Sequence, residues 1–544
     1  MSGISVYVAN SLIYKFCQAG YTRFKNSLNH VEAVQREKLA RLLEYSANTE
    51  FGKSRNLKKE MSWEKFNEVF PVTKYNDWEE MILRQKKSGQ LIVSGGECAR
   101  YQPTSGSTSK VKWIPYSKRF LSELDAVVSP LIVDSYQREK RLFRGSQYWS
   151  LSWIPTELRK NDDSHTNDDL EVLPWWKKIV ASLTMAVPSA ASFAETSEGS
   201  MMVTLAYVAS RRDLALISVW SPTFAMNMFE QMSNHRNELA EILEKGSWGK
   251  WQRELSFMPC PQSKASSLVL KNWDGKLTRD FFEKLWPGMG LISSWATSTS
   301  KFWADELIKL FPNATFIGKG LWATEGVITF PFEGKYPLAV TSHFYEFMDI
   351  DSKEIFPAWK LEKDQILKPL LTTGAGLFRY IMNDKIKVVD FAGNCPCFEF
   401  LGRLEGVDMV GEKMSGEIAQ EIINSANRNF NVNALTIFAV TGEKSSGMKP
   451  RYIMLCEKEI NHPALEDVKK LAESLLLESF HYRLARDLNQ LGPAEALFHP
   501  MARSIYQKRS EIKGMILGNL KLEPLVQCSN EEWENIISNF SETR

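Results

Sequence analysis

The stretch Thr104-Ser105-Gly106-Ser107-Thr108-Ser109-Lys110 is the most distinctive local feature of this chain. Its five hydroxyl side chains surround one glycine, and the β-rich run Val111–Pro115 follows it directly. Hydroxyl groups and a flexible backbone, whose amides can turn toward an anion, are what a polyphosphate requires. The stretch therefore indicates a phosphate-binding loop, with a polar surface turn as an equal alternative.

The spacing of this stretch excludes some common enzyme classes. A Walker loop requires G-x-x-x-x-G-K-[ST], which is missing, so a P-loop kinase or GTPase is disfavoured. The chain also lacks the G-x-S-x-G elbow of serine hydrolases.

A second cluster, Gly318–Gly326 (GKGLWATEG), lies between two predicted strands. Its glycines let the backbone pass close to a flat ligand, and Thr324-Glu325 presents a hydroxyl and a carboxylate at a strand end. Glu325 fits a magnesium ligand beside phosphate oxygens. Considered alone, the cluster slightly favours the alternative, a hairpin-like connection with a solvated acid.

A third cluster runs from Thr372 to Asp384 (TTGAGLFRYIMND) and precedes a predicted strand at Lys385–Val389. A carboxylate at a tight turn can accept hydrogen bonds from both ribose hydroxyls of a nucleotide, and Asp384 fits that task. The alternative is a type I′ hairpin turn at Asn383-Asp384.

Length and composition predict a globular protein with more than one domain. The chain has 544 residues, and single hydrophobic cores stop growing near about 250–300 residues. Apolar residues make up 44% and charged residues 24%, as in ordinary soluble domains. The net charge of +2 provides no field to attract nucleic acid or an anionic membrane.

Cysteine spacing and the N-terminus predict a cytoplasmic protein. The seven cysteines are scattered without the spacing of a disulfide framework, and Cys395 and Cys397 lack a second Cys/His pair at zinc spacing. We expect buried thiols there, and packing roles for His343 and His481. Met1–Phe16 lacks the basic segment of a secretory signal, and no apolar run reaches the length of a membrane span.

Alternating short β-rich and helical patterns predict α/β layers after a helical cap at Ser5–Tyr45. The predicted strands are Leu91–Val93, Lys112–Ile114, Leu214–Val219, Leu291–Ser294, Thr315–Ile317 and Val327–Phe330. The predicted helices are Ser117–Asp134, Ser200–Ser210, Thr223–Glu244, Thr278–Leu285 and Lys301–Leu310.

The pattern changes from Gly416 onward and predicts a small α+β domain. We place the boundary near Arg403–Gly406, which gives domains of residues 1–403 and 404–544. The predicted elements are helices at Glu417–Arg428, Ala464–Leu477 and Tyr482–Gln490, with strands at Leu435–Val440 and Tyr452–Cys456. The Asp-rich patch Asn161–Asp169 reads as a surface loop, since its carboxylates lack calcium-loop spacing.

The three clusters in this order resemble the Gretchen Hagen (auxin-responsive) acyl-acid amido synthetases, a branch of the ANL adenylate-forming superfamily. Similarity covers nearly the whole chain. The matching motifs are Thr104–Lys110 with Ile114-Pro115, Ala323–Gly326 and Gly376–Asp384, and the flanking segments are Asn48–Lys53, Phe70–Tyr75, Phe344–Phe347 and Leu491–Pro493.

The resemblance implies roles for particular residues. Ser105, Gly106, Ser107, Thr108 and Ser109 would face the phosphates of ATP. Leu321, Trp322 and Ala323 would lie near the adenine, Thr324 and Glu325 near the α-phosphate and Mg²⁺, and Asp384 near the ribose. Arg403 would lie where the two domains meet. Lys413 and Lys521 would be the catalytic basic residues of the small domain, with Lys513 an alternative to Lys521.

Two departures from plant members stand out. Those members have Tyr where this chain has Leu321, and Val-Gly-Asp where it has Met382-Asn383-Asp384. The first departure leaves the adenine contact open between Leu321 and Trp322, and the second keeps the carboxylate but alters the turn before it.

The resemblance implies an ATP-dependent ligase that adenylates a carboxylic acid and passes the acyl group to the amine of an amino acid. Two alternatives remain open: an acyl-CoA ligase of the same superfamily, and a nucleotide-binding homologue that has lost turnover. We expect the acid pocket among the helix after Tyr116, Met201–Val208 and Trp220–Met228, which favours an aromatic or apolar acid. We expect a monomer or a weak homo-oligomer.

Overall fold

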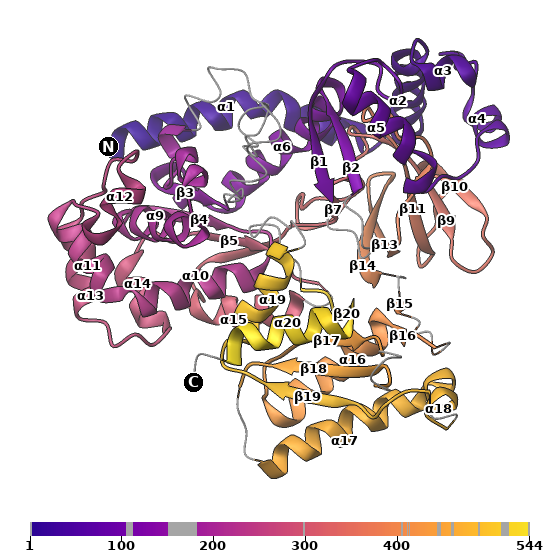
Figure 1. Ribbon diagram of the computed structural model, residues 1–544. Helices are drawn as coiled ribbons and strands as arrows, with labels where there is room; N and C mark the ends of the chain where they lie inside the picture. The colour runs from indigo at the N-terminus through magenta and orange to yellow at the C-terminus, as the bar shows by residue number, and fades with distance from the viewer. Residues whose placement is uncertain are drawn as a thin grey trace.

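The elements of the chain fall into three regions, which follow one another along the sequence with one exception (Figure 1). The exception is the antiparallel sheet of residues 344–403, which packs against the N-terminal helices instead of the helices that precede it in the sequence. The computed structural model describes residues 3–104, 112–150, 182–297, 300–403, 406–407, 409–410, 412, 414–442, 448–458, 462–487, 490–512 and 522–541.

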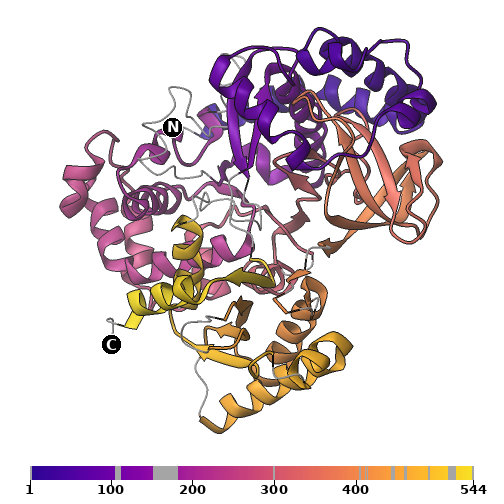
Figure 2. The same cartoon turned by 45° about the vertical axis from the view of Figure 1, so that its right-hand side comes forward.

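The first region packs helices against this antiparallel sheet, and both views show the sheet on the right-hand side, away from α11 and α13 (Figures 1 and 2). Buried Leu42, Phe66 and Phe344 belong to the hydrophobic core that joins helices to sheet. The helices are α1 (Gly3–Ser27), α2 (Val31–Ser46), α3 (Glu50–Ser54), α4 (Trp63–Val69), η1 (Tyr75–Asp77), α5 (Glu79–Ser88) and α6 (Lys118–Arg138). The sheet order is β10 (Ile355–Pro357), β9 (Phe344–Asp349), β11 (Ile366–Thr372), β13 (Asp384–Ala392) and β14 (Cys395–Arg403), with β12 (Tyr380–Ile381) beside β11 and η7 (Ala358–Lys360) nearby.

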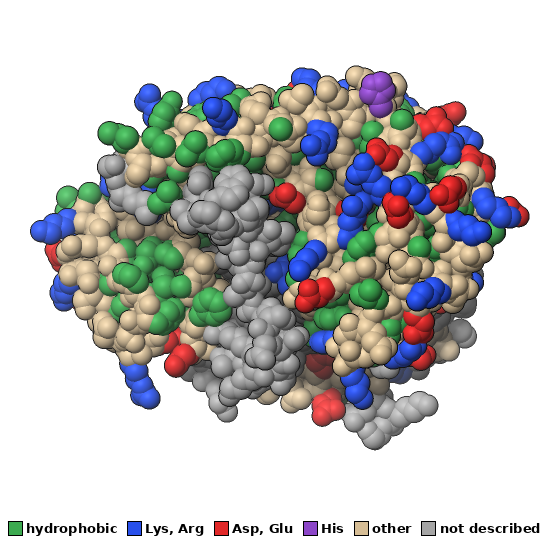
Figure 3. Space-filling model, turned by 90° about the horizontal axis from the view of Figure 1, so that it is seen from above, with side chains coloured by type: hydrophobic (Ala, Val, Ile, Leu, Met, Phe, Trp, Pro, Cys, Tyr) green, Lys and Arg blue, Asp and Glu red, His purple; other side chains and the backbone are tan. Residues whose placement is uncertain are grey.

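Charged side chains crowd the outer surface of α2–α5. Figure 3 shows them on the right-hand part of the upper face. Arg36 pairs with Glu32 and Glu64, and Arg84 pairs with Glu50. The helices thus bury one apolar face and solvate the other, as their amphipathic pattern requires.

The second region is a parallel sheet in the order β3-β4-β5-β6, covered by helices. Its core includes Ile217, Phe229 and Trp286. The strands are β3 (Ser146–Trp149), β4 (Leu214–Ser218), β5 (Leu291–Ser294) and β6 (Thr315–Gly318). The helices are η2 (Lys140–Arg144), η4 (Ser189–Phe193), α9 (Ser197–Ser210), α10 (Pro222–Asn234), α11 (Arg236–Lys245), η5 (Gly249–Trp251), α12 (Gln252–Leu255), α13 (Lys264–Lys271), α14 (Arg279–Leu285) and α15 (Lys301–Leu310).

The third region is C-terminal and has its own sheet in the order β19-β18-β17-β20. Figure 1 shows it below the other two regions. Its strands are β15 (Gly406–Val407), β16 (Met414–Ser415), β17 (Ala434–Val440), β18 (Arg451–Cys456), β19 (Glu495–Phe498) and β20 (Leu525–Cys528). Its helices are α16 (Gly416–Phe430), α17 (His462–Glu478), α18 (Phe480–Asp487), α19 (Ala502–Ile512) and α20 (Asn530–Ser541).

Arg503 on α19 connects this C-terminal region to the parallel-sheet region. Its guanidinium binds Glu230 of α10 at 2.7 Å and Glu457 at 2.6 Å, and lies 4.3 Å from the ring centroid of Trp303. A buried arginine that bridges two carboxylates holds the two regions in one relative position in this structure.

Most predicted elements are confirmed. The helical cap is α1 and α2, interrupted at residues 28–30, and the predicted helix Lys301–Leu310 is α15 with the same bounds. The predicted small domain has the expected order of helix, two strands and two helices. The Asp-rich patch Asn161–Asp169 lies outside the described residues.

Three predicted elements are wrong, and so is the turn that was the alternative interpretation of Asn383-Asp384. Leu91–Val93 is no strand, because the amides of Ile92 and Val93 donate to Oε1 of Gln85 instead of to a neighbouring strand. Thr223–Glu244 is two helices, because His235 ends α10 and caps α11. Val327–Phe330 is strand only at Val327, where it ends β8 (Gly326–Val327). Asn383-Asp384 is no type I′ turn, because neither residue has positive φ and Asp384 begins β13.

Candidate active site

Thr324 and Glu325 occupy the two-residue turn of a small hairpin. Strands β7 (Trp322–Ala323) and β8 pair with Ala323 opposite Gly326, so the turn contains only these two residues. The hairpin begins shortly after β6, at the carboxyl edge of the parallel sheet, where ligands bind in open α/β sheets. The predicted hairpin connection is therefore real, and it is compatible with a ligand-binding role.

Gly320 lets the chain enter this hairpin. Its φ is +77°, and a Cβ atom there would lie 2.5 Å from the carbonyl oxygen of Thr329. The Leu321 amide donates to both the hydroxyl of Thr329, at 2.9 Å, and its carbonyl, at 3.1 Å. Only glycine allows this left-handed close approach without strain.

Two tyrosines from distant parts of the sequence contact the turn. The hydroxyl of Tyr380, in the third cluster, donates to Oε1 of Glu325 at 3.3 Å. The hydroxyl of Tyr116 donates to the carbonyl of Thr324 at 3.2 Å. Tyr116 was not among the predicted site residues; its position in β2 (Lys112–Ser117), shortly after the phosphate-loop stretch, was the available signal.

The predicted phosphate loop lies in the sequence between strands β1 (Cys98–Thr104) and β2, of which β2 contacts this turn. Strand β1 pairs with β2, with Thr104 opposite Lys112, and β2 carries Tyr116. Ser105, Gly106, Ser107, Thr108 and Ser109 themselves lie outside the described residues.

Tyr75, the last residue of the flanking segment Phe70–Tyr75, is hydrogen-bonded to β2, the strand that carries Tyr116. Its hydroxyl accepts a hydrogen bond from the amide of Trp113 in β2 at 2.7 Å. Burial raises the pKa of Tyr75, and the negative charge of Glu325 adds to the rise. Tyr75 is therefore neutral near pH 7, and Glu325 lies within electrostatic range of it.

The third cluster is held by the flanking segments that accompany it. The amide of Ile381 donates to the carbonyl of Thr73 at 2.9 Å, and the amide of Thr73 donates to the carbonyl of Arg379 at 3.0 Å. Arg379 Nε lies 2.9 Å from Oε2 of Glu346, with both side chains buried. The segments Phe70–Tyr75 and Phe344–Phe347 thus contact the third cluster directly, which explains why they occur together with it.

Asp384 is buried at the start of β13, and its register partner is Arg403 at the end of β14. The ribose candidate therefore lies at the sheet edge where the chain leaves for the C-terminal region. The side chain of Arg403 lies outside the described part of the structure, as do Lys413, Lys513 and Lys521.

A buried network supports the turn from behind. His343 is fully buried and its Nε2 accepts from the amide of Val327 at 3.2 Å, so Nδ1 carries the proton and donates to Glu123 at 2.9 Å. Glu123 also accepts from the amide of Gly374 at 2.8 Å. Burial lowers the pKa of His343, so the ring is neutral and has the packing role predicted for it.

The two cysteines predicted to be buried thiols are so in the structure. Cys395 and Cys397 are buried free thiols whose pKa is raised by burial, to about 11 for Cys397. No group of three potential metal-binding side chains occurs among the described residues. The side chain of His481 lies outside them.

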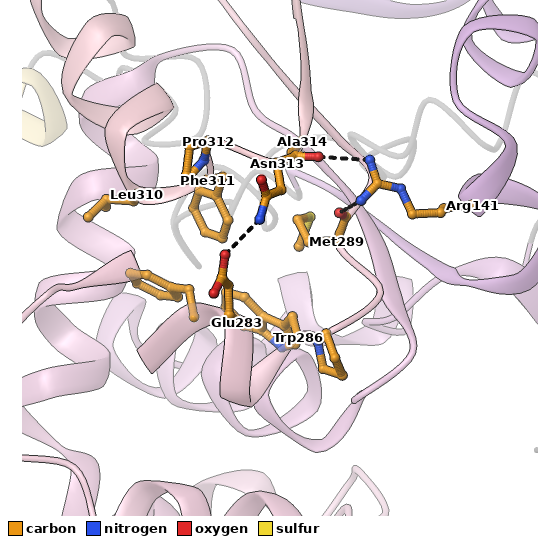
Figure 4. A pocket seen from close by; sticks show the side chains of 11 residues that line it. Arg141, Glu283, Trp286, Met289, Leu310, Phe311, Pro312, Asn313 and Ala314 are labelled. Carbon is orange, nitrogen blue, oxygen red and sulfur yellow. Dashed lines mark hydrogen bonds between the residues drawn. The ribbon is translucent and has the colours of Figure 1, made fainter. Parts of the chain in front are cut away.

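A separate pocket of about 290 Å³ lies at the opposite edge of the parallel sheet (Figure 4). Met289 and Ala314 line it. Met289 lies two residues before the start of β5, and Ala314 directly precedes β6. Its polar groups bind one another: Arg141 donates to the carbonyl of Met289, and Asn313 donates to Glu283 at 2.8 Å. This pocket is thus distant along the strands from the Thr324-Glu325 turn.

Family models match two segments of the chain. Residues 20–316 match the GH3 family N-terminal domain, and residues 336–403 match the GH3 family central domain. The first match alone covers more than half of the chain. The chain belongs to the GH3 family. The resemblance found in the three motifs is confirmed.

Curated relatives in the GH3 family are distant in sequence. Indole-3-acetic acid-amido synthetase GH3.4 of Arabidopsis thaliana is 20% identical, over 68% of this chain and 67% of the relative. Indole-3-acetic acid-amido synthetase GH3.15 of Arabidopsis thaliana is 19% identical, over 41% of this chain and 42% of the relative.

Solved structures confirm the fold class, a large α/β domain with a C-terminal α+β domain. The structure of GH3.15 acyl acid amido synthetase has a TM-score of 0.77 at 17% identity and covers 94% of each chain. A 2-hydroxyisobutyryl-CoA ligase in the postadenylation state has a TM-score of 0.50 at 10% identity, over 94% of this chain and 92% of the other. Within the described residues, no helix of this GH3 protein is long and apolar enough to cross a membrane.

Proposed function

We propose that this GH3 protein is an ATP-dependent acyl-acid amido synthetase, which adenylates a carboxylic acid and transfers the acyl group to the amine of an amino acid. The observation that carries the proposal is the Thr324-Glu325 turn, held between Tyr116 and Tyr380 in a chain whose family model matches residues 20–316. The named relatives are amido synthetases, which supports the same reaction class.

The nucleotide assignments follow the positions of the motifs. We assign Ser105, Gly106, Ser107, Thr108 and Ser109 to the phosphates, Leu321, Trp322 and Ala323 to the adenine side, Thr324 and Glu325 to the α-phosphate, and Asp384 to the ribose. Arg403 takes a place at the domain boundary, and Lys413 and Lys521 take catalytic places in the small domain.

The residues present fit a magnesium ion bound together with ATP. Mg²⁺ in nucleotide enzymes is held by one or two carboxylates plus phosphate oxygens and water, and Glu325 supplies one partly exposed carboxylate at the turn. When bound, the ion would neutralise charge on the phosphates. Glu325 would hold it, and Tyr380 would orient that carboxylate through its hydrogen bond.

The first step activates the acid. A carboxylate oxygen attacks the α-phosphorus of ATP in line, a new P–O bond forms, and the bond to the β-phosphate oxygen breaks to release pyrophosphate. Hydroxyl and amide donors around residues 104–110 would stabilise the developing charge, because preorganised donors gain most at the transition state.

The second step transfers the acyl group. The amine nitrogen attacks the acyl carbon, AMP leaves with the electron pair of the broken C–O bond, and the nitrogen loses a proton. Water must be excluded, since it would hydrolyse the intermediate. We propose that residues 404–544 form a mobile domain that closes over the site of residues 1–403, with Arg403–Gly406 as the hinge.

Two substitutions test the nucleotide site. Glu325→Ala and Asp384→Asn should each lower acid-dependent pyrophosphate release at least about 100-fold, since each removes a charged contact to the nucleotide. Asp390→Asn is the matched control, because Asp390 pairs with Lys335 on the surface. Wild-type rates in both site variants would refute the assignments.

Product analysis separates the alternatives. The pure protein is supplied with ATP, a panel of carboxylic acids including indole-3-acetate, and either CoA or mixed amino acids. The products are identified by mass spectrometry. Amides support the proposal and thioesters support an acyl-CoA ligase. Absence of pyrophosphate with every acid would indicate a homologue that binds nucleotide without turnover.

We further propose that the enzyme works in the cytoplasm as a monomer or weak homo-oligomer on small molecules, without nucleic acid or membrane partners. The free cysteines support a reducing compartment, since disulfides form in oxidising ones.

A further inference from the structure

A lysine lies among tryptophans at the carboxyl edge of the parallel sheet. Lys319 directly follows β6 and is only 9% exposed. Its ammonium donates to the hydroxyl of Ser218, the last residue of β4, and lies 5.3 Å from the ring centroid of Trp149 and 5.0 Å from that of Trp220. Strands β3, β4 and β6 thus each bring one part of this arrangement to the same edge.

The tryptophans continue from this lysine to the nucleotide turn. Trp220 lies 5.7 Å from Trp295 and 5.9 Å from Trp322, measured between ring centroids. Trp322 precedes Thr324 by two residues in the hairpin. The amide of Trp295 donates to the carbonyl of Trp220 at 2.8 Å, which fixes the two loops against each other.

These indoles are partly exposed although they cluster. Trp149, Trp220, Trp295 and Trp322 are each intermediate in exposure, unlike the fully buried Trp248 and Trp286 of the neighbouring core. Large aromatic side chains that converge without being fully buried offer apolar contact area to a ligand. A cation embedded among them favours an anionic group on that ligand, because a largely desolvated ammonium interacts strongly with an opposite charge.

We propose that Lys319 pairs with the carboxylate of the acyl acid, and that the Trp149, Trp220, Trp295 and Trp322 indoles pack against its apolar body. This inference rests on the proposed function and specifies its substrate as a flat apolar or aromatic acid. Pairing holds the carboxylate at the sheet edge that also carries the Thr324-Glu325 turn. Lys319 is then a substrate-binding residue, and the ammonium sets the preference for an acid over its uncharged analogues.

The test combines changes in the protein with changes in the ligand. Binding of benzoate, phenylacetate and their primary amides is measured by quenching of intrinsic tryptophan fluorescence without ATP, in the wild type, Lys319→Met and Lys319→Arg. Lys309→Met is the matched control, since Lys309 is an exposed lysine on α15 that pairs with Glu306. Circular dichroism and thermal melting establish that each variant is folded.

We expect the wild type and Lys309→Met to bind the acids at least ten-fold more tightly than the amides. Lys319→Met should bind an acid and its amide equally, and Lys319→Arg should retain part of the preference. If Lys319→Met does not fold, the preference of the wild type for acid over amide and the Arg variant still test the proposal. Equal binding of acid and amide by the wild type, or an unchanged preference in Lys319→Met, would overturn it.

Pyrophosphate release separates this inference from the proposed function. In Lys319→Met the KM for the acid should rise at least ten-fold while the KM for ATP changes less than two-fold. A rise confined to the KM of the amine acceptor would assign Lys319 to the acceptor instead and overturn the inference. No turnover by the wild type with any acid would sink the proposed function, while the fluorescence preference would still decide the role of Lys319.

Discussion

Arg379 and Glu346 form a buried ion pair, with 2.9 Å between Nε and Oε2, that ties the third sequence cluster (Thr372–Asp384) to strand β9. Arg379 has a left-handed backbone, with φ at +48°, and its guanidinium also donates to the carbonyl of Phe70. Burial raises the pKa of Glu346, whereas the charge of Arg379 opposes this rise. The arginine of the motif therefore positions its neighbour Tyr380 from behind the site.

Arg379→Met should lower the free energy of unfolding by about 3–5 kcal/mol, because it leaves Glu346 buried without its ion-pair partner. Urea denaturation measures the loss. Lys387→Met is the control, since the Lys387–Asp364 pair is at the surface, where solvent screens such pairs and they contribute little to stability. Equal effects of the two variants would contradict the structural role of the buried pair.

Tyr380→Phe should lower acid-dependent pyrophosphate release about ten-fold, because Glu325 loses a hydrogen bond worth about 1.5–3 kcal/mol to a charged group, part of which water can replace. The urea midpoint should be nearly unchanged. Tyr207→Phe, which removes a remote hydrogen bond to Pro259, should leave the rate unchanged. A rate for Tyr380→Phe equal to that of Tyr207→Phe would remove Tyr380 from the site.

Glu123→Ala should destabilise the protein by about 2–6 kcal/mol, because it leaves two buried donors unpaired, Nδ1 of His343 and the amide of Gly374, at about 1–3 kcal/mol each. Glu123→Gln is the matched control. Its amide oxygen can keep both bonds while its NH₂ group faces Arg119, so it should cost much less. Urea denaturation and hydrogen exchange of the Gly374 amide distinguish the two variants, and similar losses in both would contradict this account.

Lys38 should make the free energy of unfolding depend on pH in the alkaline range. Burial lowers the pKa of Lys38 to about 8 from its ordinary value of 10.5. Between these two values the unfolded chain binds more protons than the folded chain, so this lysine makes stability rise with pH across that window. Lys38→Met should be more stable than the wild type at pH 7, on the order of 1–3 kcal/mol, and the difference should vanish above about pH 10.5. Urea titrations at several pH values measure it, and a difference that is constant with pH would refute the shift.

Local patterns were sufficient for much of the fold. Apolar periodicity predicted α15 with its observed bounds and located strands β4, β5 and β6 of the parallel sheet, because these segments bury one face or are buried throughout, but it missed β3. It failed at Leu91–Val93, where the side chain of Gln85 takes the amide hydrogen bonds, and at His235, where a cap divides a continuous helical pattern. A distant acceptor and a single capping conformation leave no periodic signal.

The motifs identified the family and the reaction class, because their residue types and their order along the chain, such as Thr324-Glu325 before Asp384, are properties of the sequence itself. Only the tertiary structure decided what surrounds them. Tyr116 and Tyr380 reach one turn from opposite sides of the sequence, and Lys319 meets Ser218, Trp149 and Trp220 at one sheet edge. Such contacts join residues up to about two hundred positions apart, as with Tyr116 and Thr324. The contacts of Lys319 form because parallel strands place their carboxyl ends together, whereas Tyr116 and Tyr380 reach the turn from the antiparallel pairings of β2 and β12.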